Sequence, residues 1–276
     1  MGRITPRRVR FVGTPAVALL AALALSFSAG CRGKAVAQST AHFRAGTGFV
    51  HNTVDLDGQS HPMWVFLPKD YDPARRYPTI LFLHGLFEAG SDGSGALSGG
   101  LGPVIAQDPD RWPFIVLFPQ SSGTWRGEAR ERLALRSLDW AEQRYAIDRS
   151  RVILAGLSYG GLGTWQIGAR HAGRFAALVP VAGFGDLDSA DELRDVPVWA
   201  FHRRHDPFVH SQGSQQMCAQ IDQLGGRARY TAFDGVGHDC WDRAVAQTDL
   251  VDWMLRQRTR TATDATDARA AVSFTE

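Results

Sequence analysis

A serine, an aspartate and a histidine follow one another along this chain in an order that suits acyl transfer. Ser158 is the centre of a Gly-Leu-Ser-Tyr-Gly segment, and Asp206 and His238 lie downstream of it. A serine hydroxyl is a weak nucleophile until a base removes its proton, and imidazole does this near neutral pH. A carboxylate beside the imidazole fixes its tautomer and stabilises the imidazolium. We therefore predict Ser158 as nucleophile, His238 as general base and then acid, and Asp206 as the residue that orients His238.

The segments around Ser158 are those that would present a serine on a sharp turn. Residues 151–155 form an apolar, β-prone run of buried-strand length, and residues 161–171 have the pattern of a helix. Strand, tight turn and helix are the context in which a G-x-S-x-G segment becomes a nucleophile elbow. The flanking glycines lack a Cβ, so the backbone can take a strained turn there.

Asp206 and His238 each come just after a predicted strand. Asp206 follows the strand-like run at residues 196–201, and His238 follows the alternating run at residues 227–233. Loops at the carboxyl ends of parallel strands meet at one edge of a sheet. Ser158, Asp206 and His238 are therefore expected at the same edge.

Two other assignments of these acidic and imidazole groups are possible. Asp234 and Asp239 are also near the histidine in sequence, but Asp239 would have to fold back on its neighbour, so Asp206 is preferred. His202, His205 and Asp206 form a cluster that would suit zinc. No matching set of Cys and His stands elsewhere in the chain, so no metal is predicted.

The loop after an earlier strand is predicted to complete an oxyanion hole. Residues 77–83 are a clear buried strand that ends in a loop at residues 84–92. In this arrangement one backbone N–H comes from that loop and the other from the residue after the nucleophile. We predict the amides of Leu86 and Tyr159 as the two donors.

Three segments of the chain together resemble single-domain secreted esterases of the α/β-hydrolase superfamily. They are residues 84–85 after their strand, the elbow and helix start at residues 156–165, and residues 235–241 around the histidine. The resemblance spans residues 49–255 and points to the dienelactone hydrolase, prolyl-oligopeptidase-like "predicted peptidase", phospholipase/carboxylesterase and feruloyl-esterase-like groups. It implies hydrolysis of carboxylic esters through an acyl-enzyme, with no cofactor. The chain departs from the family in two places. Arg203 stands where the family usually has a glycine, directly after the histidine of the strand that leads to Asp206. In the loop after Gly85, the relatives commonly carry a Gly and then Glu-Arg-Gly, whereas this chain has Leu-Phe-Glu-Ala-Gly at residues 86–90.

The chain as a whole predicts one α/β-hydrolase domain over residues 49–257. Its hydrophobic content of 44% and eight tryptophans support a substantial core. Residues 50–56 and 63–67 are expected to open the sheet as an antiparallel pair. Further strands alternate with helical stretches, so we predict a mostly parallel sheet of about eight strands, flanked by helices and without a large lid. These further strands are expected near Ile80, Ile115, Val152, Leu178, Val198 and Tyr230.

Residues 1–30 have the layout of a secretory signal, with four arginines ahead of an apolar stretch. The apolar run is shorter than the ~20 residues that a membrane span needs, so a signal is preferred to an anchor. Residues 28–31 resemble a bacterial lipoprotein box, which would place a lipid on Cys31, and residues 35–37 offer an ordinary cleavage site. We expect an exported protein, either a periplasmic or outer-membrane lipoprotein or a secreted form.

The ends of the chain also bear on its charge. Removal of residues 1–30 would change the formal charge from +2 to −2, which argues against nucleic acid as a partner. Residues 31–48 are expected to be a linker and residues 258–276 a disordered tail.

Two cysteines remain if Cys31 carries a lipid. Cys218 lies on the predicted helix before the last strand and Cys240 in the loop after it, so a disulfide is one expectation. Two free buried thiols are the alternative.

Aromatic side chains near the predicted site are candidates for contact with substrate. Phe87, Trp125 and Trp241 follow three different strands, and each would otherwise be core packing. The expected substrate is a small or polymer-linked ester with a short acyl chain or an aryl group. The alternatives are a peptidase of the prolyl-oligopeptidase type and a catalytically silent binding module on the same fold.

Overall fold

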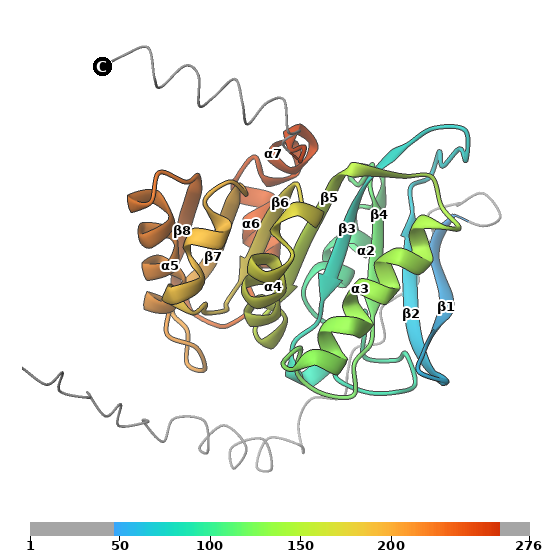
Figure 1. The fold of residues 1–276 in the computed structure, drawn as a ribbon, viewed down its shortest axis with the longest axis horizontal. Coiled ribbons are helices and arrows are strands. Elements are labelled where there is room, and N and C mark those ends of the chain that lie inside the picture. Colours follow the sequence, from blue (N-terminus) through green and yellow to red (C-terminus); the bar gives the residue numbers. More distant parts are fainter. Residues whose placement is uncertain (1–46, 260–276) are drawn as a thin grey trace, which may run out of the picture. The chain divides into compact units, whose positions relative to one another are not determined.

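The structure is a computed structural model, and it describes residues 47–259 of the chain (Figure 1). The predicted signal, the lipidation site at Cys31 and nearly all of the predicted linker and tail lie outside the described residues. Within residues 47–259, no helix is long and apolar enough to cross a membrane.

Within the same residues, eight strands form one sheet in the order β1-β2-β4-β3-β5-β6-β7-β8. β2 is antiparallel to both of its neighbours, β1 and β4, and every other pair of neighbours is parallel. The predicted mostly parallel sheet with an antiparallel opening pair is therefore confirmed. The strand bounds are β1 Gly48–Leu56, β2 Gln59–Leu67, β3 Tyr77–Leu83, β4 Ile115–Pro119, β5 Ile147–Leu157, β6 Ala177–Val181, β7 Val198–His205 and β8 Ala228–Val236.

Helices cover both faces of the sheet. α3, α4 and α5 pack on one face, and α2, α6 and α7 on the other (Figure 1). The bounds of these helices are α2 Leu101–Gln107, α3 Glu128–Glu142, α4 Tyr159–Arg170, α5 Gln212–Gln223, α6 Trp241–Gln247 and α7 Leu250–Arg256. Short 3₁₀ turns join them: η1 Leu86–Glu88, η2 Pro109–Arg111, η3 Ala172–Arg174, η4 Leu187–Ser189 and η5 Asp191–Leu193.

The alternation of side chains along each strand builds two cores. On β3, Leu81 and Leu83 pack with α3 and α4, whereas Ile80 and Phe82 pack with α2 and α6. Because both faces are covered, the central strands are apolar along their whole length, and every residue of β3 is buried.

The parallel part of the sheet brings polar residues to one edge. His84, Ser158, Asp206 and His238 follow the carboxyl ends of β3, β5, β7 and β8, respectively. In an open α/β sheet this edge is where ligands bind.

Candidate active site

Ser158 occupies a strained turn between β5 and α4. Its backbone has φ 59° and ψ −116°, a conformation that residues other than glycine rarely adopt. The Ser158 amide donates to Val181 O at 2.9 Å, which ties the turn to β6. A Cβ on Gly160 would overlap the carbonyl oxygen of Leu83, so the turn packs backbone to backbone against the end of β3. The predicted strand, turn and helix around Ser158 are all present.

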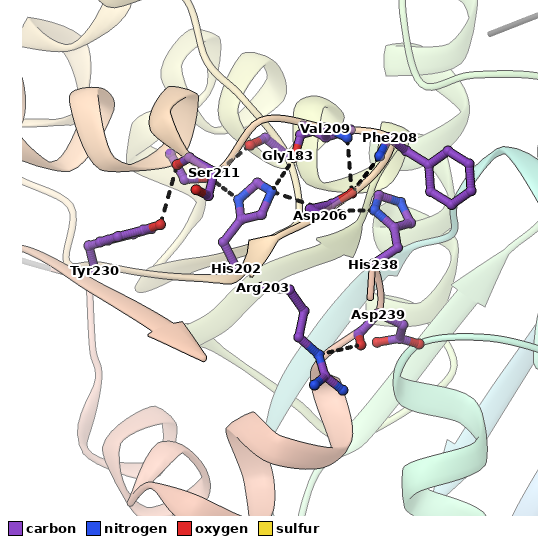
Figure 2. A network of polar contacts seen from close by, with 11 residues as sticks. Gly183, His202, Arg203, Asp206, Phe208, Val209, Ser211, Tyr230, His238 and Asp239 are labelled. Atoms are coloured by element: carbon purple, nitrogen blue, oxygen red, sulfur yellow. Dashed lines mark hydrogen bonds and ion pairs between the residues drawn. The ribbon is translucent and has the colours of Figure 1, made fainter. Parts of the chain in front are cut away.

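Asp206 and His238 are in direct contact. His238 Nδ1 lies 2.7 Å from Asp206 Oδ2, and the Asp206 side chain is completely buried (Figure 2). Asp206 Oδ1 accepts hydrogen bonds from the amides of Phe208 at 2.8 Å and Val209 at 3.0 Å. Burial alone would raise the pKa of Asp206, but hydrogen bonds from His202, His238 and the Val209 amide hold it well below its ordinary value. Asp206 is therefore a carboxylate that can fix the orientation of His238.

The alternative acids are engaged elsewhere. Asp234 is exposed and forms an ion pair with Arg204 at 2.8 Å. Asp239 accepts from the amides of Gly100 and Trp241, each at 2.9 Å. Asp206 is thus the acid that hydrogen-bonds to His238, as the sequence favoured.

Ser158 and His238 are both half-buried. Among the described residues, the hydrogen bond of the His238 ring is to Asp206 and not to Ser158. The loop after β3 lies next to both. A Cβ on Gly85 would be 3.5 Å from Ser158 Cβ and 2.7 Å from the carboxylate of Glu88, whose charge interacts with His238. Bonds between nucleophile and base are often long before substrate binds.

The two predicted oxyanion donors are the first amides of short helices. Leu86 opens η1 and Tyr159 opens α4, and the first amides of a helix have no partner within it. Neither amide donates a hydrogen bond to another described residue. Gly85 packs against Ser158, so the loop that carries Leu86 reaches the nucleophile turn.

Two of the three predicted substrate-contact residues are wrong. Trp125 is 1% exposed and donates from Nε1 to His84 O at 3.0 Å, and Trp241 is fully buried against Phe82. Gly163 of α4 makes room for Trp125, since a Cβ there would be 2.6 Å from Trp125 Cβ. Both tryptophans are therefore core-packing residues, with no surface open to a ligand in this structure.

Phe87, the third of these residues, is open to solvent. It is 70% exposed and its ring centroid lies 6.3 Å from that of Phe208, which is 44% exposed. The Phe208 ring in turn meets the His238 ring edge-on at 5.3 Å. Phe208 was not predicted, although its position two residues after Asp206 places it on the same loop. The pair forms an exposed aromatic rim beside His238.

Acidic residues of two loops, Glu88 after β3 and Asp239 after β8, interact with each other near His238. The carboxyl group of Glu88 accepts from the Gly85 amide, and Gln120 Nε2 donates to Glu88 O at 2.9 Å. Burial raises the pKa of Glu88 and of Asp239, and repulsion between the two carboxylates raises that of Glu88 further. The loop after β3 and the loop after β8 thus face each other through two acidic groups.

Arg203 stands where the resembled family usually has glycine. Its side chain lies along the histidine loop, with Nε donating to Asp239 O at 3.4 Å (Figure 2). Gly237 lies beside this side chain, since a Cβ there would be 3.4 Å from Arg203 Nε, an ordinary contact distance. The substitution therefore adds a tie between β7 and the loop after β8 while Asp206 keeps its contact with His238.

Of the two possibilities for Cys218 and Cys240, the structure has two free buried thiols and not a disulfide. Cys218 belongs to the core beneath α5, whereas Cys240 belongs to the core on the opposite face of the sheet. A disulfide needs Cα atoms within about 7 Å, and the sheet stands between these two. Burial raises the pKa of Cys218 to about 12 and also raises that of Cys240. Both thiols are therefore inert packing groups.

His202 and His205, the alternative metal ligands, lie in different environments. His202 is buried beside Asp206, and His205 is exposed at the end of β7. Within residues 47–259, no group of three or more His, Cys, Asp or Glu side chains is arranged to hold a metal ion.

The strand order and the position of the serine turn after β5 define the α/β-hydrolase class of fold. Sequence comparison gives the same result over part of the chain. Residues 134–200, which include Ser158, match the model of the prolyl oligopeptidase family.

Curated relatives include both esterases and peptidases. The chain is 26% identical over 167 residues to a bifunctional acetylxylan esterase/xylanase of Neocallimastix patriciarum, an alignment that covers 56% of this chain and 23% of that protein. It is 27% identical over 146 residues to dipeptidyl-peptidase 5 of Porphyromonas gingivalis, covering 48% of this chain and 20% of that protein. The chain thus spans less than a quarter of the length of these relatives.

Solved structures of similar fold are also hydrolases. A thermostable esterase superposes with a TM-score of 0.71 at 29% identity, covering 76% of this chain and 63% of that one. A ferulic acid esterase superposes with a TM-score of 0.60 at 19% identity, covering 75% and 97%. The chain therefore belongs to the α/β-hydrolase superfamily, in which its matches are esterases and prolyl-oligopeptidase-like peptidases.

Proposed function

We propose that the protein is a serine hydrolase that cleaves carboxylic esters through an acyl-enzyme. The observation that carries the proposal is the 2.7 Å contact between His238 Nδ1 and the buried Asp206 carboxylate, at the same sheet edge as the strained Ser158 turn. An acid that fixes one imidazole nitrogen leaves the other free to act as a base. A serine held on a sharp turn presents its hydroxyl to that base.

In the proposed reaction, Ser158 Oγ attacks the ester carbonyl while His238 Nε2 takes its proton. The tetrahedral oxyanion accepts hydrogen bonds from the amides of Leu86 and Tyr159, each worth about 3 kcal/mol of barrier. Collapse of this intermediate breaks the ester C–O bond, and His238 returns the proton to the departing alcohol. Water then repeats the sequence on the acyl-enzyme and releases the acid. These steps use only residues of the chain and require no cofactor.

The exposed aromatic pair supports short-chain or aryl esters as substrates, either small molecules or groups displayed on a polymer. Phe87 and Phe208 would lie against the acyl or alcohol group beside His238. The names of two relatives, an acetylxylan esterase and a ferulic acid esterase, agree with such esters.

The second candidate function is peptide hydrolysis by the same residues. The match of residues 134–200 to the prolyl oligopeptidase family and the likeness to dipeptidyl-peptidase 5 favour it. Export and lipid attachment at Cys31 complete the proposal, and they rest on the sequence of residues 1–31 alone.

The test is hydrolysis of p-nitrophenyl acetate, butyrate and octanoate and of a feruloyl ester by the protein and by Ser158→Ala. We expect ester turnover that the substitution lowers by about 10⁴-fold or more. Ser189→Ala is the matched control, because Ser189 only closes a surface turn through its bond to Asp186 O. It should keep full activity.

Other outcomes separate the alternatives. Cleavage of peptides but of no ester, again lost in Ser158→Ala, would replace the esterase by the peptidase. A folded protein that turns over neither, and whose Ser158 a fluorophosphonate probe does not label, would be a binding module on this fold.

A further inference from the structure

Asp206 is in contact with a second histidine besides His238. His202, on β7, is completely buried, and its Nε2 lies 3.3 Å from Asp206 Oδ2 and 3.0 Å from Val209 O. Its Nδ1 lies 3.1 Å from Ser214 Oγ. Figure 2 shows His202 and His238 on opposite sides of Asp206. The proposed reaction uses only one of these two rings.

The hydrogen-bond partners of His202 decide how many protons it carries. Ser214 Oγ donates its single hydrogen to Gly183 O at 2.7 Å, so toward His202 it can only accept, and Nδ1 must donate. At the other nitrogen, Val209 O and the Asp206 carboxylate are both acceptors, so Nε2 must donate as well. A ring that donates from both nitrogens is an imidazolium.

We propose that His202 is a buried imidazolium, ion-paired with Asp206, and that it is a positioning residue for the His238–Asp206 pair. An unpaired carboxylate in a fully buried site is costly, and the His202 cation offsets that cost. It also weakens the attraction that Asp206 exerts on a proton at His238. This last step rests on the proposed function, whereas the charge of His202 does not.

Other ionisable groups on the elements packed against β7 do not take the place of Asp206. None of them forms a hydrogen bond or an ion pair with the His202 ring. They are Arg203, Arg204 and His205 on β7 itself, Cys218 and Asp222 on α5, and Arg229, Tyr230 and Asp234 on β8.

The charge of His202 can be read without any activity. In the full chain with ¹⁵N-labelled histidine, long-range ¹H–¹⁵N spectra at pH 7.5 distinguish a protonated ring nitrogen from a bare one, and His202→Gln assigns the signals. We expect protons on both ring nitrogens of His202. One protonated and one bare nitrogen would overturn the proposal, because Ser214 would then be donating to Nδ1 instead of to Gly183 O.

The positioning role is tested by the pH dependence of kcat/KM for p-nitrophenyl acetate. In His202→Gln the cation is lost, so the acidic limb should move up by about one pH unit. Ser214→Ala removes the acceptor at Nδ1 and should move the limb the same way with His202 still present. His205→Gln, at an exposed histidine of the same strand, is the matched control and should leave the limb in place.

An acidic limb that moves in neither variant would overturn the positioning role. If both variants fail to fold, the spectrum of the unaltered protein still decides the charge. If the unaltered protein hydrolysed no ester, the proposed function would be contradicted. The charge of His202, read from the spectrum, would stand as a separate result.

Discussion

Two buried histidines at the carboxyl edge of the sheet differ in charge because of their hydrogen-bond partners. His84 Nε2 accepts from the Ser121 amide at 2.9 Å, so it carries no proton, and Nδ1 faces Gly85 O at 2.6 Å. His202 meets acceptors at both nitrogens. The two residues are of the same type, and both belong to buried strands or their ends: His84 directly follows β3, and His202 lies within β7. The hydrogen-bond partners that decide how many protons each ring carries lie elsewhere in the chain. The sequence alone therefore singled out His202 only as a candidate metal ligand.

The neutral state of His84 makes stability depend on pH. Burial is the main cause that lowers its pKa below the ordinary value of about 6.5. The folded protein therefore holds fewer protons at this site than the unfolded chain does. Its contribution to stability is fully present above pH 6.5 and is lost as the pH falls below that value toward the folded pKa. We expect the urea midpoint of unfolding to fall between pH 7.5 and pH 5.5.

His84→Gln is the comparison for this measurement, because glutamine can accept from the Ser121 amide but does not titrate. The variant should lose less of its urea midpoint over the same pH interval. An equal loss in both proteins would assign the effect to another group that titrates in this interval, such as His61, whose pKa is also lowered by burial.

At the scale of elements, the sequence predicted the turn at Ser158 well because its requirements are local. A strand, a glycine-flanked serine and a helix can be recognised from adjacent residues, and the β5–Ser158–α4 unit has that form. For Trp125 and Trp241 the sequence left two interpretations open, contact with substrate and core packing, and the structure shows core packing. Alternation along a strand gives the face of a side chain, but whether a helix covers a tryptophan after the strand depends on distant segments such as Gly163 on α4.

The close packing of the serine turn predicts a severe effect of a single methyl group. In Gly160→Ala the new Cβ would overlap Leu83 O, and neither backbone can move without displacing Ser158. We expect a loss of about 3 kcal/mol or more in the free energy of unfolding, or failure to fold. Gly173→Ala is the control, since a Cβ there meets no atom within 4 Å. Its stability, measured by urea unfolding, should stay within about 0.5 kcal/mol of the unaltered protein.

At the scale of the whole molecule, the sequence predicted a mostly parallel sheet flanked by helices but not which core each cysteine joins. Cys218 and Cys240 precede and follow β8, and proximity in sequence suggested proximity in space. Cys218 lies on α5 and Cys240 directly precedes α6, and these two helices pack on opposite faces of the sheet. The placement of these two successive helices on opposite faces of the sheet therefore separates the two thiols.

These positions predict that both thiols stay unmodified in the folded protein. Iodoacetamide should alkylate neither Cys218 nor Cys240 under native conditions, since both are buried and burial raises their pKa values. In urea without a reductant, both should react completely, as peptide mapping by mass spectrometry would measure. A linked peptide that contains both cysteines would contradict the structure.

β8 is the last strand of the sheet and pairs only with β7 among the described residues. A strand with one neighbour opens at a lower free energy than one with two, such as β5, which carries Ser158. On warming, the segment that holds His238 would therefore separate from Asp206 while the centre of the sheet is still intact. The proposed chemistry would then stop before the protein unfolds, and cooling would restore it by re-forming one strand pair rather than by refolding the chain.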